Sequence, residues 1–233
     1  MLRYLLTGGG DVKDEIIHLL LCIPIIFLSL SLHETAHGYV ASKLGDPTAK
    51  NLGRLTLNPM KHLDPIGFIC MLLMGFGWAR PVPINTRYFK KPRRDMAISA
   101  IAGPISNILL AVIFAVLLRL FYFVMPHIIP SQPTQTFINV LSYTAVFLYY
   151  GITLNVSLAV FNLLPVPPLD GSRFFYVFLP PKYYFGVMRY ENYISIAVMA
   201  LLFLGVLDPI LSFARNGIMN LIFSPLGLNA FIY

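Results

Sequence analysis

His33, Glu34 and His37 stand together in the sequence H-E-T-A-H and could carry out chemistry as a group. Residues four apart lie on nearly the same face of an α-helix, so the two imidazoles would project side by side. Two imidazoles placed in this way can bind one zinc ion, and the neighbouring carboxylate can transfer a proton. The alternative interpretation is a pair of hydrogen-bonded core histidines beside a solvated glutamate.

The composition of the chain bears on this choice. Its 233 residues are 57% hydrophobic and only 12% charged, with a mean hydropathy of +0.72, whereas soluble domains are about 25% charged. This composition excludes an ordinary soluble, fibrous or disordered protein and predicts a membrane protein. The motif lies in an apolar segment, residues 16–39, that is long enough to span a bilayer. Ionisable groups inside such a span are costly and usually functional, which favours the metal site.

The apolar segments predict an all-α polytopic membrane protein with about four to six transmembrane segments. Segments that could cross a hydrocarbon core of about 30 Å cover residues 16–39, 96–125, 137–164 and 194–213, the last interrupted near Asp208 and Pro209. Residues 66–78 are too few to span and rich in glycine, which predicts a short re-entrant or β-like element after the first segment. Extended pieces are expected on both sides of it, at residues 54–58 and 79–85. Whether the apolar tail 217–233 spans the membrane is left open.

The distribution of positive charge predicts the orientation of these segments. Ten of the 17 Lys and Arg residues lie between Lys43 and Arg94, whereas residues 126–136 contain none. Cytoplasmic loops are enriched in Lys and Arg, so we expect an integral protein of the cell membrane whose candidate site faces the cytoplasm. A basic loop between apolar segments indicates contact with anionic lipid headgroups rather than with nucleic acid. The two cysteines, Cys22 and Cys70, stand apart in apolar segments and are expected to be small core residues.

A catalytic zinc site usually needs a third protein ligand. Within or at the ends of the predicted spans, the acidic residues are Glu34, Asp170 and Asp208. Asp170 follows N-L-L-P-V-P-P-L at the cytoplasmic end of the third segment, and it comes to the depth of the histidines provided that residues 66–78 do not cross the bilayer. The competing interpretation is a proline-rich loop with an Asp-Gly turn. Asp208 is expected to be a helix-breaking turn or a packing residue.

Other polar residues in the spans and loops have less specific interpretations. For Asn107, in A-G-P-I-S-N, interhelical hydrogen bonding is the leading interpretation. For Asn162, the same role and a contact with a developing oxyanion remain open. His62 and His127 are expected to be solvated surface residues.

With these motifs in order, the sequence resembles the site-2 protease family of intramembrane zinc metalloproteases. The resemblance rests on H-E-T-A-H-G-Y at 33–39, A-G-P-I-S-N at 102–107 and N-L-L-P-V-P-P-L-D-G at 162–171, supported by L-G-D-P-T-A at 44–49 and L-N-P-M-K-H-L-D-P-I-G at 57–67. It resembles the compact form without PDZ or CBS domains. It implies one Zn²⁺ per chain held by His33, His37 and Asp170, with Glu34 as general base for an attacking water. It also implies that Asn162 and Asn107 belong to the catalytic region.

The resemblance implies a zinc metalloendopeptidase that cuts membrane proteins in or near their transmembrane segments. The expected organisation is a tail at residues 1–15, a protease core at 16–180 and a transmembrane or interfacial segment at 181–233. The expected partners are a membrane-protein substrate and the bilayer, and the oligomeric state is open. The extended pieces could pair with an unwound substrate strand. A metal transporter would distribute ligands through the membrane depth and an inactive adaptor would lack a site residue, so both are less favoured here.

Overall fold

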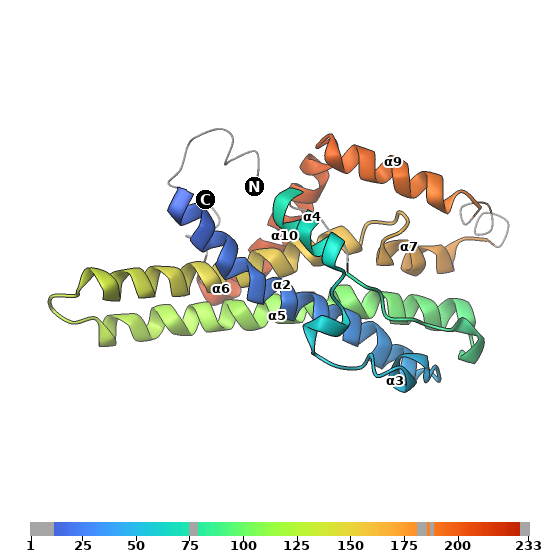
Figure 1. The fold of residues 1–233 in the computed structure, drawn as a ribbon, viewed down its shortest axis with the longest axis horizontal. Helices are drawn as coiled ribbons and strands as arrows, with labels where there is room; N and C mark the ends of the chain where they lie inside the picture. The colour runs from blue at the N-terminus through green and yellow to red at the C-terminus, as the bar shows by residue number, and fades with distance from the viewer. Residues whose placement is uncertain (1–11, 75–78, 181–185, 187–188, 229–233) are drawn as a thin grey trace.

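The structure is a computed structural model that describes residues 12–74, 79–180, 186 and 189–228. The predictions for residues 1–11, 75–78, 181–185, 187–188 and 229–233 lie outside this part. Three long helices, α2 (Val12–Lys43), α5 (Pro92–Ile128) and α6 (Gln135–Asn162), dominate it. By length and composition, these are the helices of the described part that could cross a membrane. Figure 1 shows α5 and α6 side by side as an antiparallel hairpin, with α2 crossing them obliquely.

Shorter elements connect and follow these helices. Between α2 and α5 lie α3 (Thr48–Asn51), η1 (Pro59–Lys61), α4 (Pro65–Met74) and η2 (Thr86–Tyr88); after α6 come α7 (Asp170–Phe175), η3 (Tyr176–Phe178), α9 (Glu191–Phe203) and α10 (Asp208–Leu226). The residues described form helices, turns and one isolated β-bridge, which confirms the all-α prediction.

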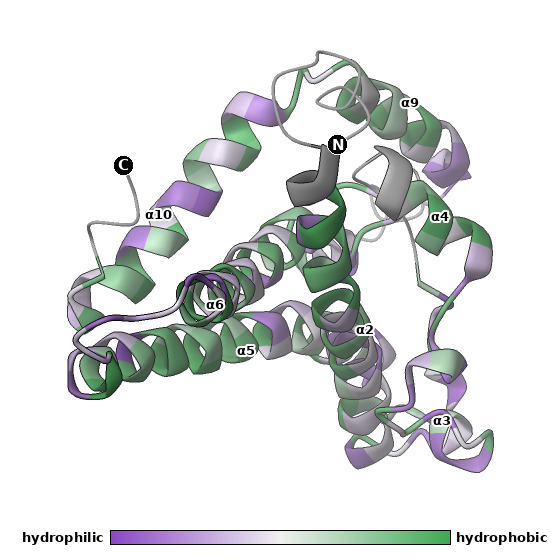
Figure 2. Ribbon diagram, turned by 60° about the vertical axis from the view of Figure 1, so that its left-hand side comes forward, coloured by the Kyte–Doolittle hydropathy of each residue, from purple (hydrophilic) through white to green (hydrophobic). Residues whose placement is uncertain are grey.

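Helix α5 is apolar on both its inner and its outer face. Its buried residues include Leu110, Phe114 and Leu118, whereas Leu109 and Leu120 on the outer face are 60% and 52% exposed. A helix that is hydrophobic all round suits a lipid environment. Figure 2 shows mostly hydrophobic colouring along α5, interrupted by hydrophilic bands, and the hydrophilic end of α2 near α3.

Glycines allow the long helices to approach closely. A Cβ on Gly151 of α6 would lie 2.5 Å from the Phe114 ring of α5. Small residues at such positions are typical of helix contacts in membranes, where close backbone approach provides most of the packing energy. The apolar core extends from this contact into α10, and its buried members are Leu110, Ala111, Phe114, Ala115, Leu118, Ile152, Val156, Val160, Met219, Ile222, Phe223 and Leu228.

The fourth predicted segment, residues 194–213, is interrupted as expected, but the break lies before Asp208 rather than at Asp208 and Pro209. Helix α9 ends at Phe203 and α10 begins at Asp208, so the chain turns earlier than the Asp-Pro pair suggested. The turn contains Gly205 at φ 71°, a left-handed conformation that favours glycine. The tail, expected as a separate apolar segment from residue 217, instead continues α10 to Leu226 and packs on α5 and α6. Asp208 is exposed at the start of α10, as its interpretation as a turn residue predicts.

The chain on either side of the segment predicted to be re-entrant is paired, so that segment begins and ends at the same place in the molecule. Leu63 and Ala79 form an antiparallel bridge, and the Arg80 N–H donates to the His62 carbonyl at 2.7 Å. Between them, α4 begins at Pro65, and the Asp64 carboxylate caps it by accepting from Gly67. Since both ends of the excursion lie together, the chain is on the same side of the molecule before and after it. The expected extended pieces flank it without forming a ladder in the described residues.

Gly151→Ala should weaken the α5–α6 pair, because the new methyl group would press on the Phe114 ring. We expect the free energy of unfolding to fall by about 1–3 kcal/mol, measured by reversible unfolding in mixed detergent micelles. Gly217→Ala in α10 is the matched control, since a Cβ there meets no atom within 4 Å and should leave stability equal or slightly higher. Equal losses in both variants would contradict this packing.

Candidate metal centre

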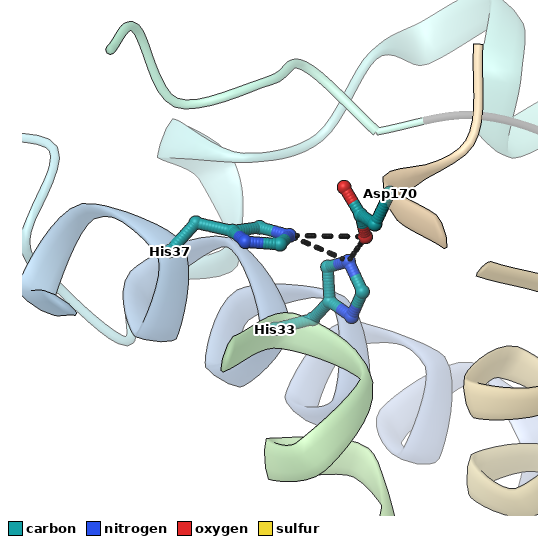
Figure 3. A group of neighbouring side chains, drawn as sticks. All are labelled: His33, His37 and Asp170. Atoms are coloured by element: carbon teal, nitrogen blue, oxygen red, sulfur yellow. Dashed lines mark hydrogen bonds and ion pairs between the residues drawn. The ribbon is translucent and has the colours of Figure 1, made fainter. Parts of the chain in front are cut away.

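Three side chains from two distant parts of the sequence converge in the structure. His33 Nε2 and His37 Nε2 lie 3.0 Å apart, and the Asp170 Oδ2 atom lies 3.1 Å from His33 Nε2 and 3.2 Å from His37 Nε2. Figure 3 shows the two imidazoles reaching from α2 toward the carboxylate at the start of α7. Among the described residues, these three are the group of His, Cys, Asp or Glu that could hold a metal ion.

The donor set and its spacing fit zinc. Two ligands on one tetrahedral Zn²⁺, each about 2.0–2.1 Å from the ion, lie about 3.3–3.4 Å from one another, slightly more than the three observed separations. Both histidines are buried, and the Asp170 side chain is 24% exposed. Burial raises the pKa of the Asp170 carboxyl, but the neighbouring His33 and His37 imidazoles outweigh burial and hold the pKa well below its usual range. The Asp170 carboxyl is therefore ionised, and its Oδ2 atom faces the two imidazole nitrogens as a possible metal ligand.

Helix α5 orients the second histidine and leaves room for both. The His37 Nδ1–H donates to the Ser99 carbonyl at 2.8 Å, and in the neutral ring this tautomer leaves the Nε2 lone pair available to a metal ion. One turn further along α5, a Cβ on Gly103 would overlap the His37 ring and come within 2.6 Å of His33 Cε1. The glycine of A-G-P therefore allows α5 to lie directly against the two imidazoles.

The proline-rich sequence after α6 delivers Asp170 to the histidines. Helix α6 ends at Asn162, and Asp170 is the first residue of α7 rather than part of an isolated Asp-Gly turn. A Cβ on Gly171 would overlap the carbonyl oxygens of Leu163 and Leu164. The small Gly171 thus lets α7 begin against the end of α6, which fixes where the Asp170 carboxylate points.

Glu34 lies beside the ligands and is held by the segment that precedes α5. Its side chain is nearly buried, and Oε2 accepts a hydrogen bond from the Val82 backbone N–H at 2.8 Å. The close approach of this segment to α2 depends on Gly38, where a Cβ would lie 2.9 Å from Val82 Cγ1 and 2.7 Å from Leu55 Cδ2. The arrangement places a buried carboxylate next to a metal-binding group.

The two asparagines named from the sequence behave differently from each other. Asn162 Nδ2 donates to the Leu158 carbonyl of its own helix at 2.9 Å. Asn107 is fully buried, and in the described part of the chain its amide has no hydrogen-bond partner. The interhelical hydrogen bond expected for Asn107 is therefore not formed among the described residues. The catalytic roles of both residues stay predictions.

The prediction that His62 is a solvated surface residue is wrong. It is 1% exposed, and its Nε2 donates to the Thr56 carbonyl at 2.7 Å, so it ties the loop that follows α3 rather than binding a metal. His127 is exposed, as predicted, and contacts the Phe123 carbonyl of its own helix.

Sequence reasoning missed several groups that support the site. The Ser99 carbonyl and the Val82 N–H are backbone groups, which no side-chain motif reveals. No individual role was predicted for Asp46, yet it is fully buried and accepts from the Asn85 N–H at 2.7 Å. Two sequence features could have indicated these contacts: Gly103, which follows a run of small residues, for the contact of α5 with the histidines, and the two prolines on either side of Val82 for the contact with Glu34.

The chain is similar to known proteins over most of its length. Residues 21–205 match the family described as Peptidase family M50. "Putative zinc metalloprotease YwhC" of Bacillus subtilis is 45% identical over 208 residues, which cover 86% of this chain and 91% of that protein. "Putative zinc metalloprotease Rip2" of Mycolicibacterium smegmatis is 33% identical over 62% of this chain and 51% of its own length. "Zinc metalloprotease MJ0392" of Methanocaldococcus jannaschii is 28% identical over 75% of this chain and 39% of its own length. No solved structure matches.

Replacing a ligand should remove the metal. We expect purified wild-type protein to hold one zinc per chain, and His33→Ala, His37→Ala and Asp170→Ala each to lower zinc affinity more than 100-fold, since even outer-shell changes cost about 10–100-fold. Metal content by mass spectrometry and competition with a chelator measure this. His127→Ala, which removes an exposed histidine, is the control and should keep its zinc. Full zinc in the Asp170 variant would exclude that residue as a ligand.

Gly171→Ala should act on the metal without removing a ligand. The added methyl group would push the start of α7 away from the end of α6 and carry the Asp170 carboxylate with it. Zinc affinity should fall about 10–100-fold, as for other groups that orient ligands, while circular dichroism should show an unchanged helix content. Unchanged zinc affinity in a folded variant would show that this contact does not place Asp170.

Proposed function

The chain belongs to peptidase family M50 and is an integral membrane zinc metalloprotease, and from this premise we propose that it cuts other membrane proteins in or near their transmembrane segments. The observation that carries the proposal is the meeting of His33, His37, Asp170 and Glu34 between helices long enough to lie in a bilayer. A peptide that reaches this site must come from the membrane or its surface.

The proposed mechanism divides the work among four side chains. His33, His37 and Asp170 would hold one Zn²⁺, which when bound acidifies a coordinated water and polarises the scissile carbonyl. Glu34 would accept the proton from the attacking water and return it to the leaving amine. The Ser99 carbonyl would keep His37 in the tautomer that presents Nε2. Asn162, at the end of α6 ahead of Asp170, would contact substrate or the developing oxyanion if its side chain left the Leu158 carbonyl.

The charge distribution supports a cytoplasmic site in the cell membrane. The segment from Lys43 to Arg94 carries ten Lys and Arg residues and includes the ends of α2 and α5 that lie nearest to the metal centre. By the positive-inside rule, this part faces the cytoplasm. Water and released fragments would then pass between the site and the cytoplasm, and the exposed apolar side chains of α5 would contact lipid.

A helical substrate must unwind before cleavage, because its carbonyls are hidden in intrahelical hydrogen bonds. The extended residues 79–85 run beside Glu34, where Val82 contacts the carboxylate. Two residues further, the Ile84 N–H has no hydrogen-bond partner in the described part of the structure. We propose that an unwound substrate strand pairs with this segment through Ile84 and so brings its scissile bond to the metal.

The two other functions considered from the sequence have less support. A transporter needs polar groups along a path through the membrane, whereas the ligands gather at one depth between α2 and α7. An inactive adaptor is expected to lack a ligand or the base, and this chain has all four residues.

Glu34→Gln should abolish cleavage and keep the metal. Loss of a general base costs about 10²–10⁴-fold in rate, so we expect at least a 100-fold lower cleavage rate in liposomes with zinc content equal to wild type. The substrates should be single-span proteins that differ only in a central Gly-Pro pair, and the variant of the substrate with that pair should be cut faster. Equal cleavage by both enzymes would contradict the assignment of Glu34, and no cleavage of any substrate by zinc-loaded wild type would contradict the proposed activity.

A further inference from the structure

The backbone N–H groups of residues 80–85 differ in whether they have a hydrogen-bond partner. Arg80 donates to His62 at 2.7 Å, Val82 donates to Glu34 at 2.8 Å, and Asn85 donates to Asp46 at 2.7 Å. Pro81 and Pro83 have no N–H, and Ile84 has no partner within the described residues. Because of the two prolines, the middle of this segment has only two backbone N–H groups, those of Val82 and Ile84. The Val82 N–H donates to Glu34, the candidate base.

The Val82 N–H is held in place from several directions. Arg54 Nη2 donates to the Arg80 carbonyl at 2.8 Å and to the Pro81 carbonyl at 3.3 Å. The Val82 side chain is 7% exposed and packs where Gly38 leaves space on α2. Pro83 restricts Val82 to an extended conformation. Because these contacts hold the backbone on both sides of Val82, the Val82 N–H has a fixed position, and that position defines where the Glu34 carboxylate lies.

We propose that the Val82 backbone N–H is a positioning group that holds Glu34 for proton transfer. A hydrogen bond from an N–H to a carboxylate is stronger than one between neutral groups, especially at a nearly buried site. By engaging Oε2, the Val82 N–H fixes the rotation of the carboxylate and leaves Oε1 to accept a proton. Without this bond, the long Glu34 side chain would sample orientations in which neither oxygen faces the metal ligands.

This assignment links substrate binding to base orientation. The same short segment carries the Val82 donor and, two residues on, the unpartnered Ile84 N–H to which substrate pairing is assigned. This link rests on the proposed function, whereas the Val82–Glu34 contact does not. A substrate that pairs at Ile84 would stiffen the segment and with it the base, so a poorly paired peptide would be bound weakly and also cut slowly.

Amide hydrogen exchange tests the contact without any activity measurement. In a peptic peptide that begins at residue 79 or 80 and ends at 84, the amides that retain label are those of Val82 and Ile84 alone. In the zinc-loaded wild type we expect the Val82 amide to exchange slowly and the Ile84 amide to exchange fast. Glu34→Ala removes the acceptor and should speed the slow amide at least tenfold, whereas Glu34→Gln keeps an oxygen acceptor and Val82→Ala keeps the donor, so both should stay slow. An unchanged slow amide in Glu34→Ala would overturn the proposal.

Backbone substitution tests the positioning role. Replacing residue 82 by its α-hydroxy analogue converts the Pro81–Val82 amide to an ester, which removes the N–H and weakens the Pro81 carbonyl as an acceptor for Arg54. We expect kcat to fall at least about tenfold, since hydrogen bonds to charged groups are among the stronger ones, with KM and zinc content unchanged. The same change at residue 84 should instead raise KM. An unchanged kcat for the residue 82 ester would overturn the proposal; a wild type that cuts nothing would count against the proposed function, and hydrogen exchange would then decide this inference.

Discussion

The fold depends on bringing three lone-pair donors from distant parts of the chain to one buried point. Two imidazole nitrogens and a carboxylate oxygen lie within 3.2 Å of one another, although Asp170 is more than 130 residues from the histidines. Buried donors at this spacing are compatible with low energy when a cation binds between them. The helix contacts follow from this requirement: Gly103 makes room for the rings, Gly151 joins α6 to α5, and Gly171 sets α7 against the end of α6.

A second constraint is that α2 and α7 must meet on one side. The bridge between Leu63 and Ala79 closes the excursion through α4, so the polypeptide re-enters α5 from the side on which α2 ended. The returning chain then passes Glu34 and is fixed there by Asp46, Arg54 and Val82. The irregular connection is thus next to the metal-binding group: it supplies the Val82 contact to Glu34 and, in our proposal, the backbone edge at which a substrate pairs.

Side-chain chemistry and hydrophobic length were predictable from the sequence, and backbone contacts were not. The spacing of His33 and His37, the scarcity of acids in the spans and the length of α2, α5 and α6 indicated the ligand set and the helical bundle. The break between α9 and α10 was misplaced because the left-handed Gly205 turn has no signature beyond one glycine in an apolar run. His62 was predicted to be solvated and no individual role was predicted for Asp46, because charge patterning cannot reveal that a loop folds back on a helix end.

The most direct test of this account is the zinc X-ray absorption spectrum of the purified wild-type protein in detergent. A site made by His33, His37 and Asp170 with one open position predicts four nitrogen or oxygen scatterers at about 2.0–2.1 Å, two of them with the multiple-scattering pattern of imidazole. A spectrum with sulfur scatterers, with fewer than two imidazoles or with three or more would contradict the site, because the protein would then hold its metal through other residues.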